Sequence, residues 1–234
     1  MHISVVIAAL NEEKYIGKTL QTLNAQKSSH EFEVIVGDGF STDKTAQISK
    51  KLGAKVVKEK RHSAAFERNA GAKIAKGDII AFTDADAQIP SDWVENIAKE
   101  FEASKDVGFV YGPVYFSDTS EFEKILSKFS MDPYMWFCAL IGFHNPIGSN
   151  IAIRRGLFEK LKGFDTSLVT AEDLDLAKRA SQFGKIVFSG KMQAFVSARR
   201  VKKWGYLYYI AFHLWNALRF HLTGRSTRSY APVR

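Results

Sequence analysis

Residues 77–86 read Gly-Asp-Ile-Ile-Ala-Phe-Thr-Asp-Ala-Asp, an apolar run that is closed by two acids. The run predicts a β-strand over residues 78–83 that is buried on both faces. Similar runs occur at 3–9 and at 33–36, and the second of these leads into Gly37-Asp38-Gly39. Strands that are apolar on both faces are typical of a parallel sheet covered by helices. Ligands of such sheets bind beyond the carboxyl ends of the strands, so these acids mark a candidate site.

Helical patterns separate these strands along the chain. We therefore predict an α/β fold in which a Rossmann-like, mostly parallel central sheet is flanked by helices. In the first half the pattern predicts strands at 3–9, 33–36, 55–57 and 78–83, and helices at 12–25, 41–52, 64–75 and 90–103. In the second half it predicts strands at 107–116, 147–153, 186–188 and 193–197, and helices from 121 onward, at 172–183 and at 204–222.

The composition bounds the class of protein. The chain has 234 residues, of which 46% are hydrophobic and 25% charged, as in a globular domain with a sizeable core. Collagen-like and broadly disordered chains are excluded. The single cysteine, Cys138, excludes a disulfide scaffold and fits a reducing compartment. The sequence shows neither a signal peptide nor an apolar stretch of ~20 residues, so we expect a cytoplasmic protein, with peripheral contact to the cytoplasmic membrane face as an extension.

The charges are divided unequally along the chain. The formal net charge is +8, yet no Asp or Glu follows Asp175, whereas 12 Lys and Arg do. The basic character therefore belongs to the C-terminal end. Such asymmetry predicts an anionic partner, which can be a phosphate group, a nucleic acid or an acidic membrane surface.

The paired acids Asp84 and Asp86 suggest a metal site. Carboxylates on one turn are the oxygen ligands that Mg²⁺ or Mn²⁺ prefers, and such an ion neutralises a diphosphate leaving group. A D-x-D triplet alone has low specificity, because residues 173–175 repeat it. The alternative is that both acids serve the turn and cap the helix that follows.

Four stretches in order resemble one family. They are Ser4-Val5-Val6-Ile7-Ala8-Ala9-Leu10-Asn11-Glu12-Glu13; Asp38-Gly39-Phe40-Ser41-Thr42-Asp43-Lys44-Thr45; Arg68-Asn69-Ala70-Gly71 with the D-x-D run 77–86; and Glu172-Asp173-Leu174-Asp175-Leu176-Ala177-Lys178-Arg179. Together they resemble the family 2 inverting glycosyltransferases, which have the GT-A fold. The ordered set is specific although each piece is not, and Phe40 stands where the family commonly has Gly.

The resemblance implies a role for each matching residue. Asp173 would be the catalytic general base, and Asp86 the metal ligand. Asp38 would bind the nucleotide base, and Arg68 would lie near the nucleotide or its phosphates. Around them, the donor site would include Ala8, Asn11, Glu12 and Asp84. The cofactor would be Mn²⁺ or Mg²⁺, and the donor a UDP- or GDP-linked sugar.

Four further residues are candidates on the phosphate or acceptor side. Asn150, in the segment 145–150, would contact the donor sugar, or else belong to a turn into the next strand. Glu172 would contact the acceptor, or else stabilise the start of its helix through the helix dipole. Arg199 and Arg200 would bind the diphosphate or a phosphorylated acceptor, or else form a solvated basic run. Asp175 is expected to be structural.

The last part of the chain combines apolar and basic residues. We divide the chain into a nucleotide-binding half, about 1–104, an acceptor half, about 105–200, and a C-terminal helix with a basic tail, 201–234. The helix 204–222 carries one more polar stripe at helical spacing: Tyr206, Tyr209, His213, Asn216 and Arg219. This segment suits a membrane interface, where with 134–143 it would receive a lipid-linked acceptor, or it packs on the domain or in a homodimer contact. His213 or His221 is either a third metal ligand or a residue of the helix face.

The most economical function is an enzyme: a metal-dependent inverting glycosyltransferase that moves a single sugar. The absence of a Gly-rich basic loop after the first strand counts against a sugar-phosphate nucleotidyltransferase on the same fold. A basic membrane-binding or nucleic-acid-binding module is the third reading. Nucleic acid is not expected, because the aromatic residues cluster on an apolar helix and not across a sheet surface.

Overall fold

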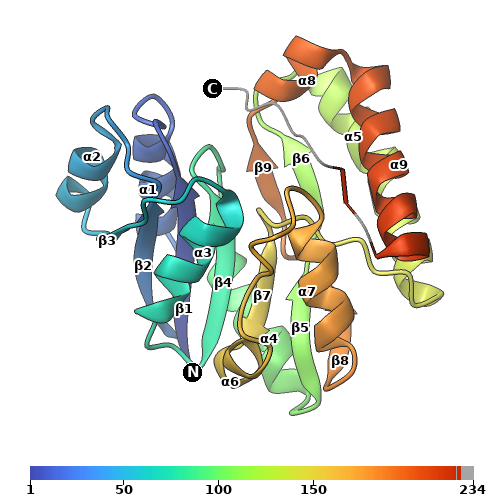
Figure 1. Cartoon of the computed structure of the whole chain (residues 1–234), viewed down its shortest axis with the longest axis horizontal. Helices are drawn as coiled ribbons and strands as arrows, with labels where there is room; N and C mark the ends of the chain where they lie inside the picture. The colour runs from blue at the N-terminus through green and yellow to red at the C-terminus, as the bar shows by residue number, and fades with distance from the viewer. Residues whose placement is uncertain (225, 228–234) are drawn as a thin grey trace.

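A seven-stranded sheet forms the centre of the computed structural model, which describes residues 1–224, 226 and 227 (Figure 1). The strand order is β3-β2-β1-β4-β7-β5-β8, and only β7 runs antiparallel to its neighbours. The predicted class, a mostly parallel sheet flanked by helices, is confirmed. The first four strands are β1 (His2–Ala9), β2 (Glu31–Asp38), β3 (Lys55–Lys58) and β4 (Ile79–Asp84).

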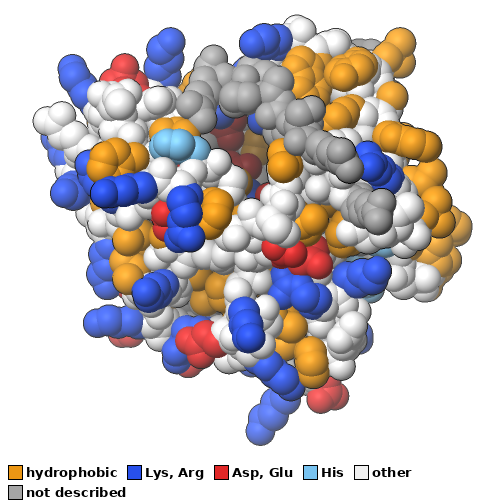
Figure 2. Space-filling model, in the orientation of Figure 1, with side chains coloured by type: hydrophobic (Ala, Val, Ile, Leu, Met, Phe, Trp, Pro, Cys, Tyr) orange, Lys and Arg blue, Asp and Glu red, His pale blue; other side chains and the backbone are white. Residues whose placement is uncertain are grey.

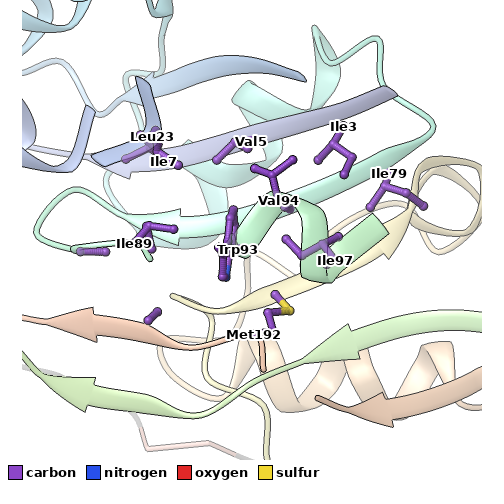
Figure 3. Close-up of a cluster of buried hydrophobic side chains, with 14 of the residues drawn as sticks. Ile3, Val5, Ile7, Leu23, Ile79, Ile89, Trp93, Val94, Ile97 and Met192 are labelled. Atoms are coloured by element: carbon purple, nitrogen blue, oxygen red, sulfur yellow. The ribbon is translucent and has the colours of Figure 1, made fainter. Parts of the chain in front are cut away.

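Strand β1 is buried because helices cover both faces of the sheet. Its residues Ile3, Val5 and Ile7 point to the side of α1 (Ile16–Asn24) and α4 (Trp93–Ala103), where they meet Leu23, Val94 and Ile97 (Figure 3). Val6 points to the opposite side and joins the cluster that contains α3 (Ala64–Lys73), α6 (Arg155–Lys160) and α7 (Glu172–Ala180). This alternation explains why apolar residues occupy both faces of the strand, with Ser4 as the one buried polar residue in it. The remaining helix of the first half is α2 (Thr45–Lys51).

The second half of the sheet differs from the prediction at residues 107–116. The single expected strand is two: β5 (Val107–Tyr111) stays in the main sheet, while β6 (Val114–Phe116) pairs with β9 (Ala194–Val196). Gly112 and Pro113 separate them. A side chain at Gly112 would overlap the Met192 carbonyl, and Pro113 has no N–H for a ladder bond. The other strands are β7 (Ile151–Arg154), which begins later than expected, and β8 (Lys185–Phe188).

The expected helix 204–222 is present with nearly the expected bounds, and a short helix that the sequence did not predict precedes it. Gly205, with φ of 83°, separates α8 (Arg199–Trp204) from α9 (Tyr206–Thr223). Beside α9 lies α5 (Glu121–Leu140), which begins at a capping box formed by Ser120 and Glu123. Arg225, Arg228 and most of the expected basic tail lie outside the described residues. Within the part of the chain that the structure describes, no helix is both long and apolar enough to cross a bilayer.

Candidate functional site

The loops that follow β1 and β2 are joined by hydrogen bonds at the carboxyl edge of the sheet. The Asn11 amide N–H donates to Ser41 Oγ (2.9 Å), and Asn11 Oδ1 accepts from the Thr42 N–H (2.8 Å). The Glu12 N–H donates to Thr45 Oγ1 (2.8 Å). The helix predicted at 41–52 therefore begins later than expected, since α2 starts after Lys44 and the side chains of Ser41 and Thr42 hold the two loops together.

Asp38 ends β2 and is fully buried. Its Oδ1 accepts from the Ser41 N–H, while its Oδ2 has no hydrogen-bond partner among the described residues. A buried acceptor without a partner costs free energy, so a ligand that donates an N–H here gains affinity. Nearby lies an open hollow of about 690 Å³, which is lined by Leu10, Asn11, Phe40, Thr42, Lys60 and His62. Sequence reasoning missed Lys60 and His62, which belong to no motif.

Backbone conformation also marks this edge. Asn11, Phe40 and Ala171 adopt positive φ angles of 56°, 65° and 64°, and the fourth such non-glycine residue among those described, Lys162, lies elsewhere. Residues held in the left-handed region store strain and concentrate at functional sites. Ala171 directly precedes Glu172 and Asp173, and Asn11 directly precedes Glu12. The strain therefore falls beside the candidate chemical groups.

Arg68 forms the first of two ion clusters. It projects from α3 with 4% of its side chain exposed, and it donates to Asp84 Oδ1 (2.9 Å) and Glu172 Oε1 (2.8 Å). Burial lowers the pKa of Arg68, but Asp84, Glu172 and Asp173 outweigh this effect and raise it. Gly148 packs against the guanidinium, where an added Cβ would lie 2.7 Å from Nη1, so the expected close backbone approach at Gly148 is present.

Asp173 lies in the first turn of α7 beside this cluster. Its Oδ2 accepts from the Gly148 N–H and its Oδ1 from the Leu174 N–H, both at 2.8 Å. Burial and the neighbouring Glu172 raise the pKa of Asp173 to about 7, although Arg68 and the two N–H donors act in the opposite direction. A carboxyl group that titrates near neutrality is suited to proton transfer.

The other two acids of α7 have structural partners. Glu172 lies in the first turn of α7, as the helix-dipole expectation requires, while its contact with an acceptor stays a prediction. Its carboxylate also pairs with Arg68 and so ties α7 to α3. Asp175 pairs with Arg179 one turn later, at 2.6 Å, and this agrees with its expected structural role.

Arg199 forms the second ion cluster. It projects from α8 and donates to both carboxylate oxygens of Glu12, at 2.8 and 2.6 Å, and it lies 3.2 Å from Asp86 Oδ2. Burial, Asp84 and Glu12 raise the pKa of Asp86 to about 7, while Arg199 lowers it. Asp86 therefore lies in an excess of negative charge that one arginine only partly compensates.

This donor set fits a divalent cation that a ligand helps to hold. Among the described residues, no three His, Cys, Asp or Glu side chains are arranged to hold a metal. Mg²⁺, however, binds through one or two carboxylates and completes its coordination with substrate phosphates and water. Asp86 supplies such a partial site, because the negative charges of Asp84 and Glu12 act on it as well. The reading of His213 as a third ligand gains no support, and burial together with Arg200 lowers its pKa to about 4.

The structure separates the remaining candidates. Ala8 lies at the end of β1, in register with Gly37 and Asp84. Arg200 lies over the Trp204 ring, 5.9 Å from its centroid. Burial raises the pKa of Tyr209 on α9, and the charges of Asp84 and Asp86 raise it further. Tyr209 is thus a site neighbour that was expected only as part of a polar stripe.

Asn150 does not reach the site. It is fully buried, and its Oδ1 accepts from Trp93 Nε1 while its amide donates to the carbonyls of Pro113 and Met192. Its side chain satisfies groups that burial would otherwise leave without partners. The prediction of a donor-sugar contact is therefore replaced by the alternative, a structural residue at the entry to β7.

Three comparisons show which known proteins this chain resembles in sequence and in fold. The family model described as "Glycosyl transferase family 2" matches residues 4–162. A dolichyl N-acetyl-alpha-D-glucosaminyl phosphate 3-beta-D-2,3-diacetamido-2,3-dideoxy-beta-D-glucuronosyltransferase of Methanococcus voltae is 26% identical over 190 residues, covering 74% of this chain and 59% of that protein. A beta-monoglucosyldiacylglycerol synthase of Nostoc is 31% identical over 193 residues, covering 76% of this chain and 40% of that protein. The chain thus spans less than two thirds of the length of either relative.

A solved structure extends the comparison to the fold. Mannosyltransferase PcManGT from Pyrobaculum calidifontis, in complex with GDP-Man and Mn²⁺, superposes with a TM-score of 0.70 at 23% identity, over 98% of this chain and 65% of that one. At this identity the likeness concerns the fold, and it agrees with the GT-A class that the sequence predicts.

Proposed function

The chain belongs to glycosyl transferase family 2, and from this membership we propose that it moves a single sugar from a nucleoside-diphosphate sugar to an acceptor hydroxyl or a lipid phosphate, with inversion. The observation that carries the proposal is the Asp173 carboxyl, whose pKa is raised to about 7 at the edge where Asp38 and Asp86 also lie. One base on the acceptor side and acids on the donor side are what a direct displacement requires.

The reaction follows from that arrangement. Asp173 accepts the proton of an acceptor hydroxyl as its oxygen forms a bond to the anomeric carbon. The bond from that carbon to the diphosphate breaks, and the nucleoside diphosphate leaves with the electron pair. A phosphate acceptor arrives as an anion and needs no base. Gly148 and Leu174 orient the Asp173 carboxyl through their N–H groups.

On the donor side, Asp38 offers its unpartnered Oδ2 to an N–H of the base. Ala8, Asn11 and Glu12 line the base and ribose region. Arg68 lies behind Asp84 and orients it, so it acts near the nucleotide through its partner. Arg199 approaches the diphosphate from α8.

Asp86 is the proposed ligand of Mn²⁺ or Mg²⁺, with Asp84 beside it. When bound, the ion neutralises charge on the diphosphate as it leaves. The related fold bound to GDP-Man and Mn²⁺ and a similar one bound to UDP-GlcNAc support a GDP- or UDP-linked donor.

For the acceptor we favour a lipid carrier, reached by a cytoplasmic protein that lies peripherally on the membrane through residues 204–222. Names of relatives that mention a dolichyl phosphate and a diacylglycerol support this part of the proposal. A homodimer contact through the same helix is the alternative.

A thermal-shift panel tests the donor site. The native protein is heated with UDP, GDP, CDP or dTDP, with and without Mn²⁺ or Mg²⁺. We expect one nucleotide to raise Tm by several degrees, with a larger shift when the ion is present, because it binds only the folded state. Asp38→Asn should abolish the shift. Asp92→Asn, an exposed acid at the start of α4, should preserve it.

Two results would contradict the proposal. One is the absence of a shift with every nucleoside diphosphate. The other is release of pyrophosphate from a nucleoside triphosphate and a sugar phosphate, which would assign the site to a nucleotidyltransferase.

A further inference from the structure

Helix α9 buries part of its polar stripe and leaves most of its large apolar side chains exposed, unlike an ordinary surface helix. Its polar stripe faces the domain: Asn216 is 5% exposed and bonds to Thr170, and the Tyr206 hydroxyl donates to Glu123. Its apolar face is in solvent, where Leu207 is 87% exposed and Trp215 62%. A helix on a globular protein normally buries its apolar stripe. This helix therefore presents a face that needs a partner.

Helix α5 extends that face. The two helices run in the same direction, since Glu123 meets Tyr206 near their first residues and Asn145, just after α5, meets His221 near the end of α9. Of the 20 large apolar side chains exposed among the described residues, 15 lie on α5, its C-cap and α9. We name this the α5–α9 surface, and Figure 2 shows its orange side chains along the right edge of the molecule. Its most exposed members are Phe129, Phe137, Leu140, Leu207, Trp215 and Leu222.

The charges around this surface favour an anionic partner. No acid follows Asp175 in the chain, and Lys202 and Lys203 are exposed on α8, directly before α9. The acids at this end are already engaged: Asp118 pairs with Lys202, and Glu123 accepts from Ser120 and Tyr206. Cations beside an apolar face that carries Trp and Tyr are the pattern of a segment that lies in a membrane interface.

We propose that the α5–α9 surface docks on an anionic lipid bilayer, with α9 lying in the plane of the interface. The absence of a helix able to cross a membrane among the described residues fits a helix that lies flat. The nearly complete exposure of Leu207 and Leu140 provides the apolar area that partitions into the headgroup region.

Docking through this surface would also place the proposed catalytic residues close to the bilayer. On its inner side α9 packs Phe220 against Ala171 and Leu174, the residues on either side of Glu172 and Asp173, and Tyr209 lies in the field of Asp84 and Asp86. One helix therefore contacts both the proposed bilayer and the catalytic turn. Resting on the proposed function, this arrangement assigns the acceptor to a lipid carrier whose polar head reaches Asp173 from the interface.

Vesicle co-sedimentation tests the surface. The native protein is mixed with phosphatidylcholine vesicles, or with the same vesicles containing roughly 30% phosphatidylglycerol. We expect binding to the anionic vesicles that weakens with salt. The double variant Leu207→Glu/Trp215→Glu should bind at least about tenfold more weakly. Phe183, an apolar residue on another face, is 52% exposed; Phe183→Glu is the control and should bind as the native protein does.

The results of this experiment distinguish failure of the docking proposal from failure of the proposed function. Unchanged binding by the double variant, or native binding that is equal on neutral vesicles, would overturn the docking proposal. So would a native dimer in light scattering that the double variant dissociates, because a second copy would then cover the face. A retained nucleotide-induced Tm shift shows that the variant is folded with an intact donor site. Vesicle binding without sugar transfer to any acceptor would contradict the proposed function and leave the docking surface in place.

Discussion

Two arginines organise the site, and they differ in how firmly the fold holds them. Arg68 bridges Asp84 and Glu172 with 4% of its side chain exposed, whereas Arg199 bridges Glu12 and Asp86 with 22% exposed. Gly148 packs on the Arg68 guanidinium, and Phe164 lies 5.5 Å from it. Arg199 projects from the six-residue helix α8, which ends at Gly205. The Arg68 cluster is therefore part of the framework, and we propose that in the Arg199 cluster a metal ion can take the place of the arginine.

The difference extends to the acids. Asp173, beside Arg68, keeps a raised pKa because it is buried, and its two N–H donors fix its direction. Asp86 keeps a raised pKa even though Arg199 is next to it, because burial raises the pKa and the neighbouring Asp84 and Glu12 raise it further. We infer that the Arg68 cluster holds Asp173 in place as the proposed base. We infer further that the Arg199 cluster leaves negative charge that a bound metal ion would neutralise.

The largest effect is expected at the base. Asp173→Asn removes the proton acceptor while keeping the shape, so kcat/KM with a hydroxyl acceptor should fall by roughly 10³- to 10⁴-fold. The raised pKa of Asp173 means that its ionised form costs stability above about pH 7. The variant should therefore unfold in urea at no lower concentration than the native protein at pH 8. Activity within tenfold of the native value would contradict the role of the base.

The next effect concerns the framework itself. Arg68→Met leaves Asp84 and Glu172 without their buried counter-charge, and breaking a buried ion cluster in this way costs about 3–5 kcal/mol of the free energy of unfolding. Urea unfolding followed by circular dichroism measures this loss. Arg61→Met is the control, since the Arg61 side chain is 65% exposed in its pair with Glu59, and its loss should change stability far less. A similar loss in both variants would show that Arg68 is no special framework residue.

The pH profile gives a smaller effect. A base with a pKa of about 7 must be ionised to act, so kcat should fall about tenfold per pH unit below pH 7 and level off above it. Saturating donor and metal are required, because Asp86 also has a raised pKa. Asp175→Asn should leave the midpoint unchanged, as that acid pairs with Arg179 outside the cluster. A flat profile between about pH 5 and 8 would place the base elsewhere.

The sequence predicted the parts of the site that local pattern determines. Asp38, Asp84 and Asp86 follow strands of one parallel sheet, and parallel strands bring such residues to a common edge. The ion pairs could not be predicted, because Arg68 and Glu172 are 104 residues apart and Arg199 and Glu12 are 187 apart. Such pairs exist only once the helices pack.

The errors of the prediction have identifiable causes. The amide side chain of Asn150 can hydrogen-bond to a sugar or to buried backbone carbonyls. Only its burial, which the sequence does not show, decides between the two. The division of the strand at Pro113 was visible as a residue that interrupts strands, but the apolar run around it dominated the pattern. The inward turn of the polar stripe on α9 depends on its contacts with Glu123 and Thr170, which lie far away in sequence.

The smallest effect should come from Arg199. The Arg199 side chain is 22% exposed, against 4% for Arg68, although its partners Glu12 and Asp86 are only 10% and 11% exposed. Arg199→Met should therefore cost less than Arg68→Met, about 1–2 kcal/mol, for leaving nearly buried acceptors without their partner. Because the variant leaves two acids without a compensating cation, added Mn²⁺ should restore most of the lost stability, measured as Tm with and without the ion. The same Mn²⁺ should not restore Arg68→Met, whose lost bonds include Glu172 on α7. Equal rescue of both variants, or of neither, would remove the distinction between a fixed and an exchangeable cation.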